Sequence, residues 1–247
     1  SQQYLGDNNK KSITREWASR TATTLKSLGI NLNFTPSVDL NINPDCPIIG
    51  KLERSFSDKP QVVIDNAKIV IEEHRKKGIL TSIKHFPGHG SSASDTHKGI
   101  ADVTNTYSEE ELIPFKVLIE EGMVDMVMSS HVFNSNFDEN YPATMSYNTL
   151  TNKLRVQMNY DGIIISDDMA MGAIAKEYDL TTCLEKAINA GVDMFIFSNN
   201  GEKYDKEIGY KAIDTIFRLV KQGKVKEKSI NNSYARIQKL KSDMGLR

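Results

Sequence analysis

The feature that most constrains the fold is an alternation of strand-like and helix-like segments along the chain. Five short apolar segments are typical of strands, at residues 31–40, 81–86, 123–132, 162–168 and 193–200. Segments with helical spacing of apolar residues alternate with them, at 13–29, 59–78, 108–122, 148–158 and 170–190, with two more helices between 205 and 245. Strands that alternate with helices form a parallel sheet covered by helices. The pattern predicts an α/β fold, either an open doubly wound sheet or part of an eight-stranded barrel.

Length and composition exclude several classes of protein. The 247 residues suit one large domain or two small ones, and 31 basic against 32 acidic residues leave a net charge of −1. A protein that binds a polyanion would carry a basic excess, so we expect no nucleic-acid partner. The apolar runs are much shorter than the roughly 20 residues that span a bilayer. Cys46 and Cys183 form no metal motif or disulfide framework, so a soluble cytoplasmic or exported location stays open.

Polar side chains follow every expected strand. They are Asp39; Lys84 and His85; Ser130 and His131; Ser166, Asp167 and Asp168; and Asn199 and Asn200. In both candidate folds the chemistry lies at the carboxyl ends of the strands. The sequence therefore predicts a functional site at that edge of the sheet.

The densest polar cluster is the segment KHFPGHGSSASDTHKG at 84–99. It contains three histidines and one acid, namely His85, His89, His97 and Asp95. Asp95 and His97 are two residues apart, so in an extended segment the carboxylate reaches one imidazole nitrogen. Such a pair fixes the tautomer and makes the other nitrogen a better proton carrier. Two alternatives are a solvated loop with incidental histidines and a zinc site, but the spacing matches no ligand pattern, so we expect no metal or other cofactor.

The second cluster is SDDM at 166–169, which ends a continuous apolar run typical of a strand buried on both faces. Adjacent strand residues point to opposite sides, so Asp167 and Asp168 are expected to have different roles. One faces the ligand site and the other caps the next helix. The alternative is that both are capping residues.

Isolated polar residues give weaker signals. His131 either hydrogen-bonds a substrate or packs beneath its loop, and Arg54 by itself is typical of a surface charge. Asp39 and Asp193 are expected to be turn or cap residues rather than catalysts.

Taken together, these motifs resemble the β-N-acetylglucosaminidase branch of glycoside hydrolase family 3. The similarity rests on KHFPGHG followed by Asp-Thr-His and then GIIISDDM, with ITREWASRTATTLKSLGINLNFTPSVDL and LERSF upstream. The resemblance implies a (β/α)8 barrel of the TIM type, with residues 1–247 as a single, partial barrel domain. It also implies a retaining hydrolase that releases terminal β-linked N-acetylglucosamine from oligosaccharides such as peptidoglycan (muropeptide-like) fragments.

The resemblance also assigns roles to individual residues. Asp167 matches the nucleophile, His97 the acid/base and Asp95 its partner. The residues expected to contact the sugar are Lys84, His85 and Arg54, together with His131, while His89 is expected to hold the loop. A His–Asp pair then replaces the usual acid/base carboxyl group.

The sequence departs from the family at its beginning. The family places a strand with Asp-x-Glu-Gly-Gly and a following Arg before the point where this chain starts. Five expected strands against eight in a barrel predict that the N-terminal strands are missing. Two alternatives remain open: a phosphorylase, because a neutral imidazole would not repel phosphate, and a non-catalytic sugar-binding fragment. The presence of Asp95, His97 and Asp167 argues against the second alternative.

Overall fold

The computed structural model describes residues 1–96, 99–200 and 204–245. The chain divides into two compact units. The first unit comprises Ser1–Ser94 and Asn105–Ser130, and the second comprises Asp95–Thr104 and His131–Arg247. The expected single domain stays a prediction.

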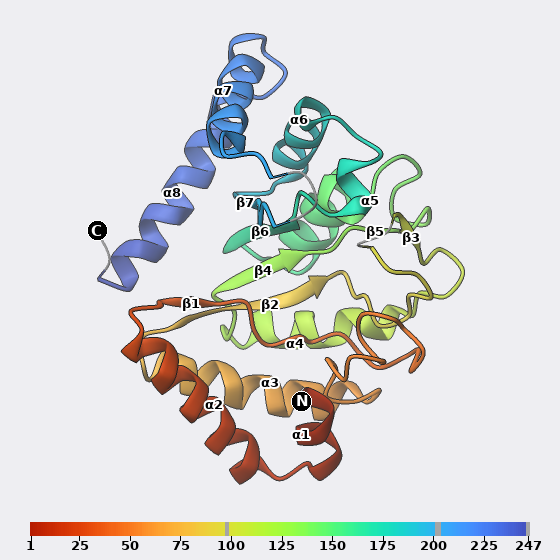
Figure 1. The fold of residues 1–247 in the computed structure, drawn as a ribbon, viewed down its shortest axis with the longest axis vertical. Helices are drawn as coiled ribbons and strands as arrows, with labels where there is room; N and C mark the ends of the chain where they lie inside the picture. The colour runs from red at the N-terminus through yellow and green to blue at the C-terminus, as the bar shows by residue number, and fades with distance from the viewer. Residues whose placement is uncertain (97–98, 201–203, 246–247) are drawn as a thin grey trace. The chain divides into compact units, whose positions relative to one another are not determined.

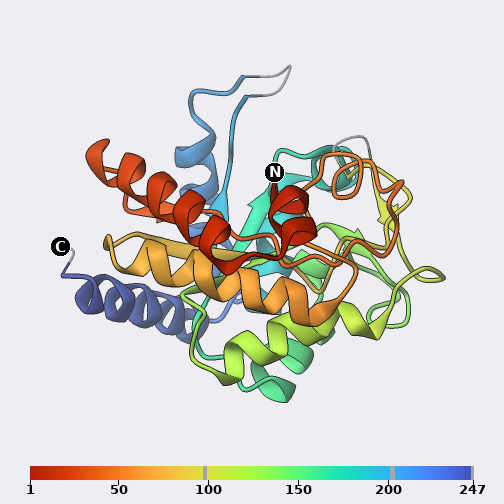
Figure 2. The same ribbon diagram turned by 90° about the horizontal axis from the view of Figure 1, so that it is seen from below.

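The first unit contains three parallel strands with helices packed against them (Figure 1). β1 (Leu32–Asn33) pairs with β2 (Leu80–Phe86), which pairs in turn with β4 (Met126–Ser129). The helices of this unit are α1 (Gln2–Asn8), α2 (Lys11–Ser27), α3 (Pro60–Arg75), the short 3-10 helix η1 (Glu109–Leu112) and α4 (Ile113–Glu120). Helix α3 packs against β2 and lies between α2 and α4, which Figure 2 shows from below.

Helix α3 shows why these residues form this layer. Pro60 occupies its first turn, where the missing N–H costs nothing. The buried side chains Val63, Ile64, Ala67, Val70 and Ile71 recur at helical spacing and form one apolar face. Burying each large aliphatic side chain contributes about 1.5–3 kcal/mol, which fixes the helix on the sheet.

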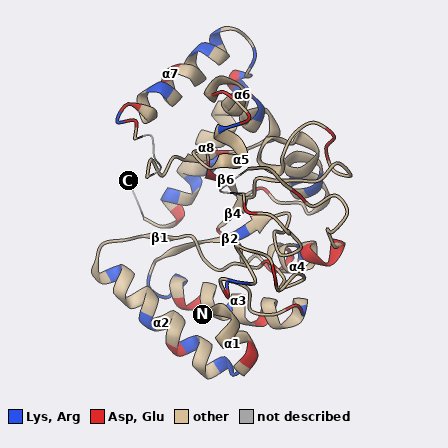
Figure 3. Ribbon diagram, turned by 45° about the vertical axis from the view of Figure 1, so that its right-hand side comes forward, with Lys and Arg blue, Asp and Glu red and all other residues tan. Residues whose placement is uncertain are grey.

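The outer surfaces of these helices carry charges of both signs. Figure 3 shows basic and acidic residues interspersed along α2 and α3. Arg15 on α2 pairs with the Glu73 carboxylate on α3 at 2.5 Å, and Lys76 pairs with the same carboxylate at 2.6 Å. Charges of both signs therefore alternate on the surface formed by these two helices.

The second unit contains two pairs of parallel strands. β6 (Ile163–Asp168) pairs with β7 (Met194–Ile196), and β3 (Ala101–Asp102) pairs with β5 (Val132–Phe133). Its helices are η2 (Ala143–Met145), η3 (Asn148–Gln157), α5 (Gly172–Ala175), α6 (Leu180–Ala190), α7 (Ile208–Lys221) and α8 (Glu227–Asp243). Helix α6 packs against both α7 and α8. A buried cluster that includes Leu184, Ile188 and Leu219 joins α6 to α7.

Asp193 has a structural role that goes beyond the expected turn or cap. Its carboxylate accepts hydrogen bonds from Arg155 at 2.7 Å and from the backbone N–H of Ile164 at 2.9 Å. It also accepts from Ser233 at 2.7 Å and pairs with Arg236 at 3.3 Å. The residue therefore ties the start of β6 to α8 and is not available for catalysis.

Several element boundaries differ from the sequence-based expectation. The strand expected at 31–40 is only two residues long, because Pro36 has no N–H to donate, and pairing resumes as a single bridge between Ser37 and Lys84. The helix expected at 170–190 is divided into α5 and α6, because Asp179 caps α6 by accepting from the N–H groups of Thr181 and Thr182. Helix α1 and the short strands β3 and β5 were not predicted.

The α/β class and the parallel pairing are confirmed. Strands occupy each of the five predicted positions, and residues 1–30, all of them described, contain helices and no strand. The closed (β/α)8 barrel stays a prediction. Among the helices described, none combines the length and the apolar character needed to cross a membrane.

Candidate active site

In the first unit, the carboxyl end of β2 is organised by Asp39, which is fully buried. One carboxylate oxygen accepts from the backbone N–H groups of His85 at 3.1 Å and of His89 at 2.9 Å. The other accepts from His85 Nδ1 and from the Ser37 hydroxyl, both at 2.7 Å. Four donors thus converge on a single buried side chain, so Asp39 holds the start of the KHFPGHG segment in place.

The charge of Asp39 is maintained by this environment. Burial alone would raise the pKa of the carboxyl group, but the electrostatic attraction and the hydrogen bonds that Asp39 has with His85, with a smaller contribution from His89, outweigh it. The pKa of Asp39 therefore lies well below its usual range, and the group is ionised at neutral pH.

His85 connects Asp39 to Arg54. Its Nε2 lies 3.1 Å from a terminal nitrogen of Arg54, and its Nδ1 lies 2.7 Å from Asp39. A guanidinium group can only donate, so Nε2 accepts and the proton resides on Nδ1. The second terminal nitrogen of Arg54 donates to the carbonyl of Ile48 at 2.9 Å. The structure therefore brings together two residues expected to bind the sugar, His85 and Arg54. Hydrogen bonds link Asp39 to His85 and His85 to Arg54.

The segment after β2 is held by a second buried carboxylate. Glu111, in η1, accepts the backbone N–H of Gly90 at 2.7 Å and is fully buried. A Cβ at Gly90 would lie 1.6 Å from the carbonyl oxygen of Leu40, so only glycine fits there. His89 is buried as well, and its role in holding the loop stays a prediction.

Lys84 is the remaining first-unit residue that was expected to contact the sugar. It is half-buried, and its carbonyl oxygen accepts the backbone N–H of Val38 at 2.7 Å. The backbone of Lys84 thereby joins β2 to the segment that carries Asp39. Its contact with a sugar stays a prediction.

In the second unit, Asp167 and Asp168 end strand β6. The residues from Ile163 to Ser166 are buried, and both aspartates are half-buried. This confirms the expected buried run that ends in acids. Asp167 accepts the backbone N–H of Asp168 at 2.8 Å, which fixes one of its carboxylate oxygens.

Asp168 is occupied by structural contacts. Its carboxylate accepts from the backbone N–H of Ala170 at 3.0 Å and from that of Ser198 at 2.9 Å. The Ser198 hydroxyl donates a further, short hydrogen bond to the same group. Asp168 therefore ties the turn after β6 to the segment after β7. Asp168 thus serves the turn instead of capping a helix, and the role of Asp167 stays a prediction.

His131 is buried and bonded within the second unit. Its Nδ1 lies 2.9 Å from the Thr144 hydroxyl, and its Nε2 lies 3.0 Å from the carbonyl oxygen of Asp168. Since both ring nitrogens are engaged, this geometry favours the packing role over substrate binding. The contact with Asp168 makes His131 a support for the end of β6.

The expected His–Asp pair is only partly visible. Asp95 is half-buried, whereas His97 lies outside the described residues. The carbonyl oxygen of Thr96 accepts the N–H of Ala173 at 3.0 Å. The Asp95–Thr96 segment therefore lies against the start of α5, which follows β6 in the chain.

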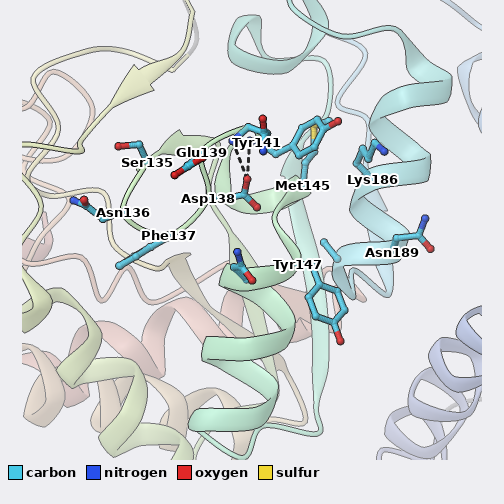
Figure 4. A pocket seen from close by; sticks show the side chains of 13 residues that line it. Ser135, Asn136, Phe137, Asp138, Glu139, Tyr141, Met145, Tyr147, Lys186 and Asn189 are labelled. Carbon is cyan, nitrogen blue, oxygen red and sulfur yellow. Dashed lines mark hydrogen bonds between the residues drawn. The ribbon is translucent and has the colours of Figure 1, made fainter.

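A groove in the second unit lies away from these residues (Figure 4). It has a volume of about 530 Å³ and is lined by residues 135–141, by the start of η3 and by α6. Asp138 is used locally, because it accepts the backbone N–H groups of Asn140 and Tyr141 at 2.9 and 3.1 Å. Lys186 lies over the Tyr141 ring at 5.5 Å. No described residue of the predicted site lines this groove.

Possible metal-ligand groups and the two thiols can be assessed in the part of the chain that the structure describes. No group of three His, Cys, Asp or Glu residues there has the arrangement of a metal site. Both cysteines are buried free thiols, and burial raises the pKa of Cys183 to about 12. Cys183 is therefore not a nucleophile at neutral pH.

Sequence reasoning missed the two buried carboxylates of the first unit. Asp39 was recognised at the end of an expected strand but was assigned to a turn. Glu111 stands in a run of three acids that is typical of an exposed helix start, and the neighbouring Glu109 and Glu110 are indeed exposed. Only its contact with Gly90, distant in sequence, reveals its role.

Comparison with known proteins identifies a matching family and similar relatives. Residues 1–240 match the family described as glycosyl hydrolase family 3 N terminal domain. The chain is 32% identical to "Beta-hexosaminidase A" of Pseudoalteromonas piscicida over 244 residues, which cover 92% of this chain and 40% of that protein. The chain thus spans well under two thirds of the length of this relative.

Solved structures resemble the chain over nearly its whole length. A glycoside hydrolase family 3 beta-N-acetylglucosaminidase from Paenibacillus sp. str. FPU-7 has a TM-score of 0.91 and 31% identity, and the match covers 99% of this chain and 46% of that one. Zn bound CbsA from Thermotoga neapolitana has a TM-score of 0.85 and 25% identity, with coverage of 99% and 51%. Both likenesses support the α/β fold.

Proposed function

Because this chain belongs to glycosyl hydrolase family 3, through the N-terminal domain that its residues 1–240 match, we propose that it acts as a glycosidase on N-acetylglucosaminides. The substrate class comes from its relatives, which are named beta-hexosaminidase and beta-N-acetylglucosaminidase. The finer proposal is a retaining hydrolase that releases a terminal β-linked N-acetylglucosamine.

The observation that carries this proposal is the position of Asp167 at the end of the buried strand β6, next to Asp168, whose carboxylate is used by the turn. Asp168 accepts three hydrogen bonds from Ala170 and Ser198 and serves the turn. Asp167 is half-buried and stands at the carboxyl end of a buried strand, where parallel α/β folds place reactive groups. A carboxylate in that position suits the attacking group of a retaining glycosidase.

The proposed reaction has two steps. Asp167 attacks the anomeric carbon while His97 gives its proton to the leaving oxygen, and a covalent glycosyl-enzyme forms. His97 then takes a proton from water, the resulting hydroxide attacks the same carbon, and the sugar leaves with Asp167 restored. Asp95 orients the imidazole by accepting from its other nitrogen.

The residues that we propose to bind the sugar hydroxyls are Arg54, His85 and Lys84. Arg54 has a permanent positive charge and several N–H donors, and His85 and Ile48 hold its orientation. Asp39 fixes the His85 tautomer through the contact at 2.7 Å. Lys84 adds a second cation, so hydroxyl oxygens would meet donors whose positions are set before binding.

Turnover of a chromogenic aryl β-N-acetylglucosaminide tests the proposed function. We expect release of the aryl group and of free N-acetylglucosamine, with retention of the β-configuration in the first product seen by NMR. Added phosphate should not raise the rate or give a sugar 1-phosphate. Absence of turnover alongside tight sugar binding would instead identify a binding module.

Metal removal gives a second expected result. Asp167 and His97 are sufficient for the proposed chemistry, so chelation with EDTA followed by dialysis should leave the rate of turnover unchanged. The measurement is informative because one of the similar solved structures, CbsA from Thermotoga neapolitana, has zinc bound. Loss of activity that stoichiometric zinc restores would contradict the metal-free mechanism.

A further inference from the structure

The groove between residues 135–141, η3 and α6 has the size of a ligand site. Its volume of about 530 Å³ lies within the range of roughly 300–1,000 Å³ that small-molecule sites occupy. Figure 4 shows residues 135–137 on the left, Lys186 and Asn189 of α6 on the right, and Tyr147 between them. No described residue of the predicted site lines the groove, so a ligand held there binds apart from Asp167.

The walls of the groove are held in place by the protein itself. Asp138 accepts the backbone N–H groups of Asn140 and Tyr141 at 2.9 and 3.1 Å, which fixes the turn between them. The Thr151 hydroxyl donates to the carbonyl oxygen of Ala190 at 2.7 Å, which joins η3 to the end of α6. A site with fixed walls loses less conformational entropy when a ligand binds.

Tyr147 supplies an exposed aromatic surface in this groove. It is 55% exposed, although it immediately precedes η3, whose first turn contains the buried residues Thr149 and Leu150. Tyr141 contributes a second ring, but Lys186 lies over it at 5.5 Å. A tyrosine side chain offers an apolar ring face and a polar hydroxyl, and such side chains are enriched at binding surfaces. The free ring face of Tyr147 is therefore suited to a ligand.

The polar groups of the groove can both donate and accept hydrogen bonds. Within the part of the chain that is described, no protein group pairs with the Glu139 carboxylate, the Asn140 side-chain amide or the Tyr147 hydroxyl. The carboxylate accepts, whereas the amide and the hydroxyl both donate and accept. A sugar has the matching chemistry, because its hydroxyl groups donate and accept and its C–H groups pack on an aromatic face.

The charges of the groove argue against an anionic ligand. Lys186 is the only cation among the described lining residues, and its ammonium group lies 3.4 Å from the Glu185 carboxylate and over the Tyr141 ring. Asp138 and Glu139 contribute two negative charges. A phosphate group would meet more acidic than basic side chains, whereas an uncharged sugar would not be repelled.

We propose that this groove is a second carbohydrate-binding site, where N-acetylglucosamine units of a longer glycan bind apart from the reacting residues. Tyr147 provides the ring on which a sugar stacks, and Glu139 and Asn140 provide hydrogen-bonding groups for its hydroxyls. The identity of the sugar rests on the proposed function. A site of this kind keeps a long glycan on the protein while its end is cleaved.

NMR titration of the Asp167→Asn variant, which should bind glycans without cleaving them, tests this inference. Addition of the N-acetylglucosamine trimer should shift the backbone amide resonances of Asn140, Tyr147 and Asn148 in a saturable manner. Inorganic phosphate at the same concentrations should leave these resonances unchanged. A shift with phosphate, or no shift with the trimer, would overturn the proposal.

Two further variants make the test specific for the groove. In the Asp167→Asn background, Tyr147→Ala should weaken binding of the trimer, followed at Asn140 and Asn148, by about tenfold, because the stacking face is lost. Tyr210→Ala is the matched control, since Tyr210 is 75% exposed on α7 and does not line the groove. Equal effects of the two tyrosine substitutions would contradict the site.

The possible outcomes separate this inference from the proposed function. If the wild-type protein cleaves an aryl N-acetylglucosaminide but the trimer leaves the groove resonances unchanged, the second site is overturned and the hydrolase function stands. If the groove resonances shift but the wild-type protein shows no turnover, the proposed function is contradicted and the carbohydrate-binding site stands.

Discussion

Replacing Asp167 with asparagine should lower turnover by several orders of magnitude while leaving the protein folded. The amide nitrogen cannot attack the anomeric carbon, so the covalent route is lost. The amide oxygen can still accept the N–H of Asp168, which lies 2.8 Å from the carboxylate in the wild-type structure. The measurements are kcat/KM for an aryl β-N-acetylglucosaminide and the thermal unfolding midpoint of both proteins.

A mechanism-based label identifies the nucleophile directly. A fluorinated glycosyl donor that slows release of the sugar should attach to Asp167, and peptide mass spectrometry should locate it. Asp168→Asn is the matched control: it weakens the contacts with Ala170 and Ser198, so we expect lower stability without loss of the labelled residue. Label on Asp168 or elsewhere would refute the assignment of Asp167.

The strand positions were predictable because they depend on local sequence. The apolar run before Asp167 forms a buried strand as expected, since an uninterrupted apolar segment with acids at its end has few other stable places in an α/β fold. The strand before Asp39 was overestimated in length. Pro36 cannot donate to a neighbouring strand, and this local fact was sufficient to predict the break.

The hydrogen bonds that hold the candidate site in place were not predictable, because they join segments far apart in the chain. Asp39 meets His85 and His89, and Glu111 meets Gly90. Nothing in the sequence distinguishes a glutamate at an exposed helix start from one that turns inward. Its burial is decided by the packing of η1 against a segment about 20 residues earlier.

Local sequence predicted the proposed reacting residue Asp167, whereas it did not predict the residues that support the site. Asp167, the proposed nucleophile, stands at the end of a buried strand, so its position could be predicted from local sequence. A supporting group needs only to reach the backbone that it holds, so it can come from any element that packs nearby. Asp39 reaches His89 from the segment after β1, and His131 reaches the carbonyl oxygen of Asp168 from the segment after β4.

The second large effect expected is that of His97→Ala, and its size should depend on the leaving group. A general acid contributes about 10²–10⁴-fold, but only where the departing oxygen needs a proton. A nitrophenolate leaves readily without one, whereas a sugar alkoxide does not. The variant should therefore lose far more activity towards a disaccharide of N-acetylglucosamine than towards a nitrophenyl glycoside, measured as the glycosylation step with each substrate.

Asp95→Ala should give the same pattern in a weaker form. The imidazole remains in this variant, but it loses the carboxylate that orients it and raises its basicity. The ratio of the losses on the two substrates is the informative quantity, because a change in folding or sugar binding would lower both rates alike. Equal losses on both substrates for His97→Ala would show that it does not protonate the leaving group, and the pair would then serve to anchor its loop or contact the sugar.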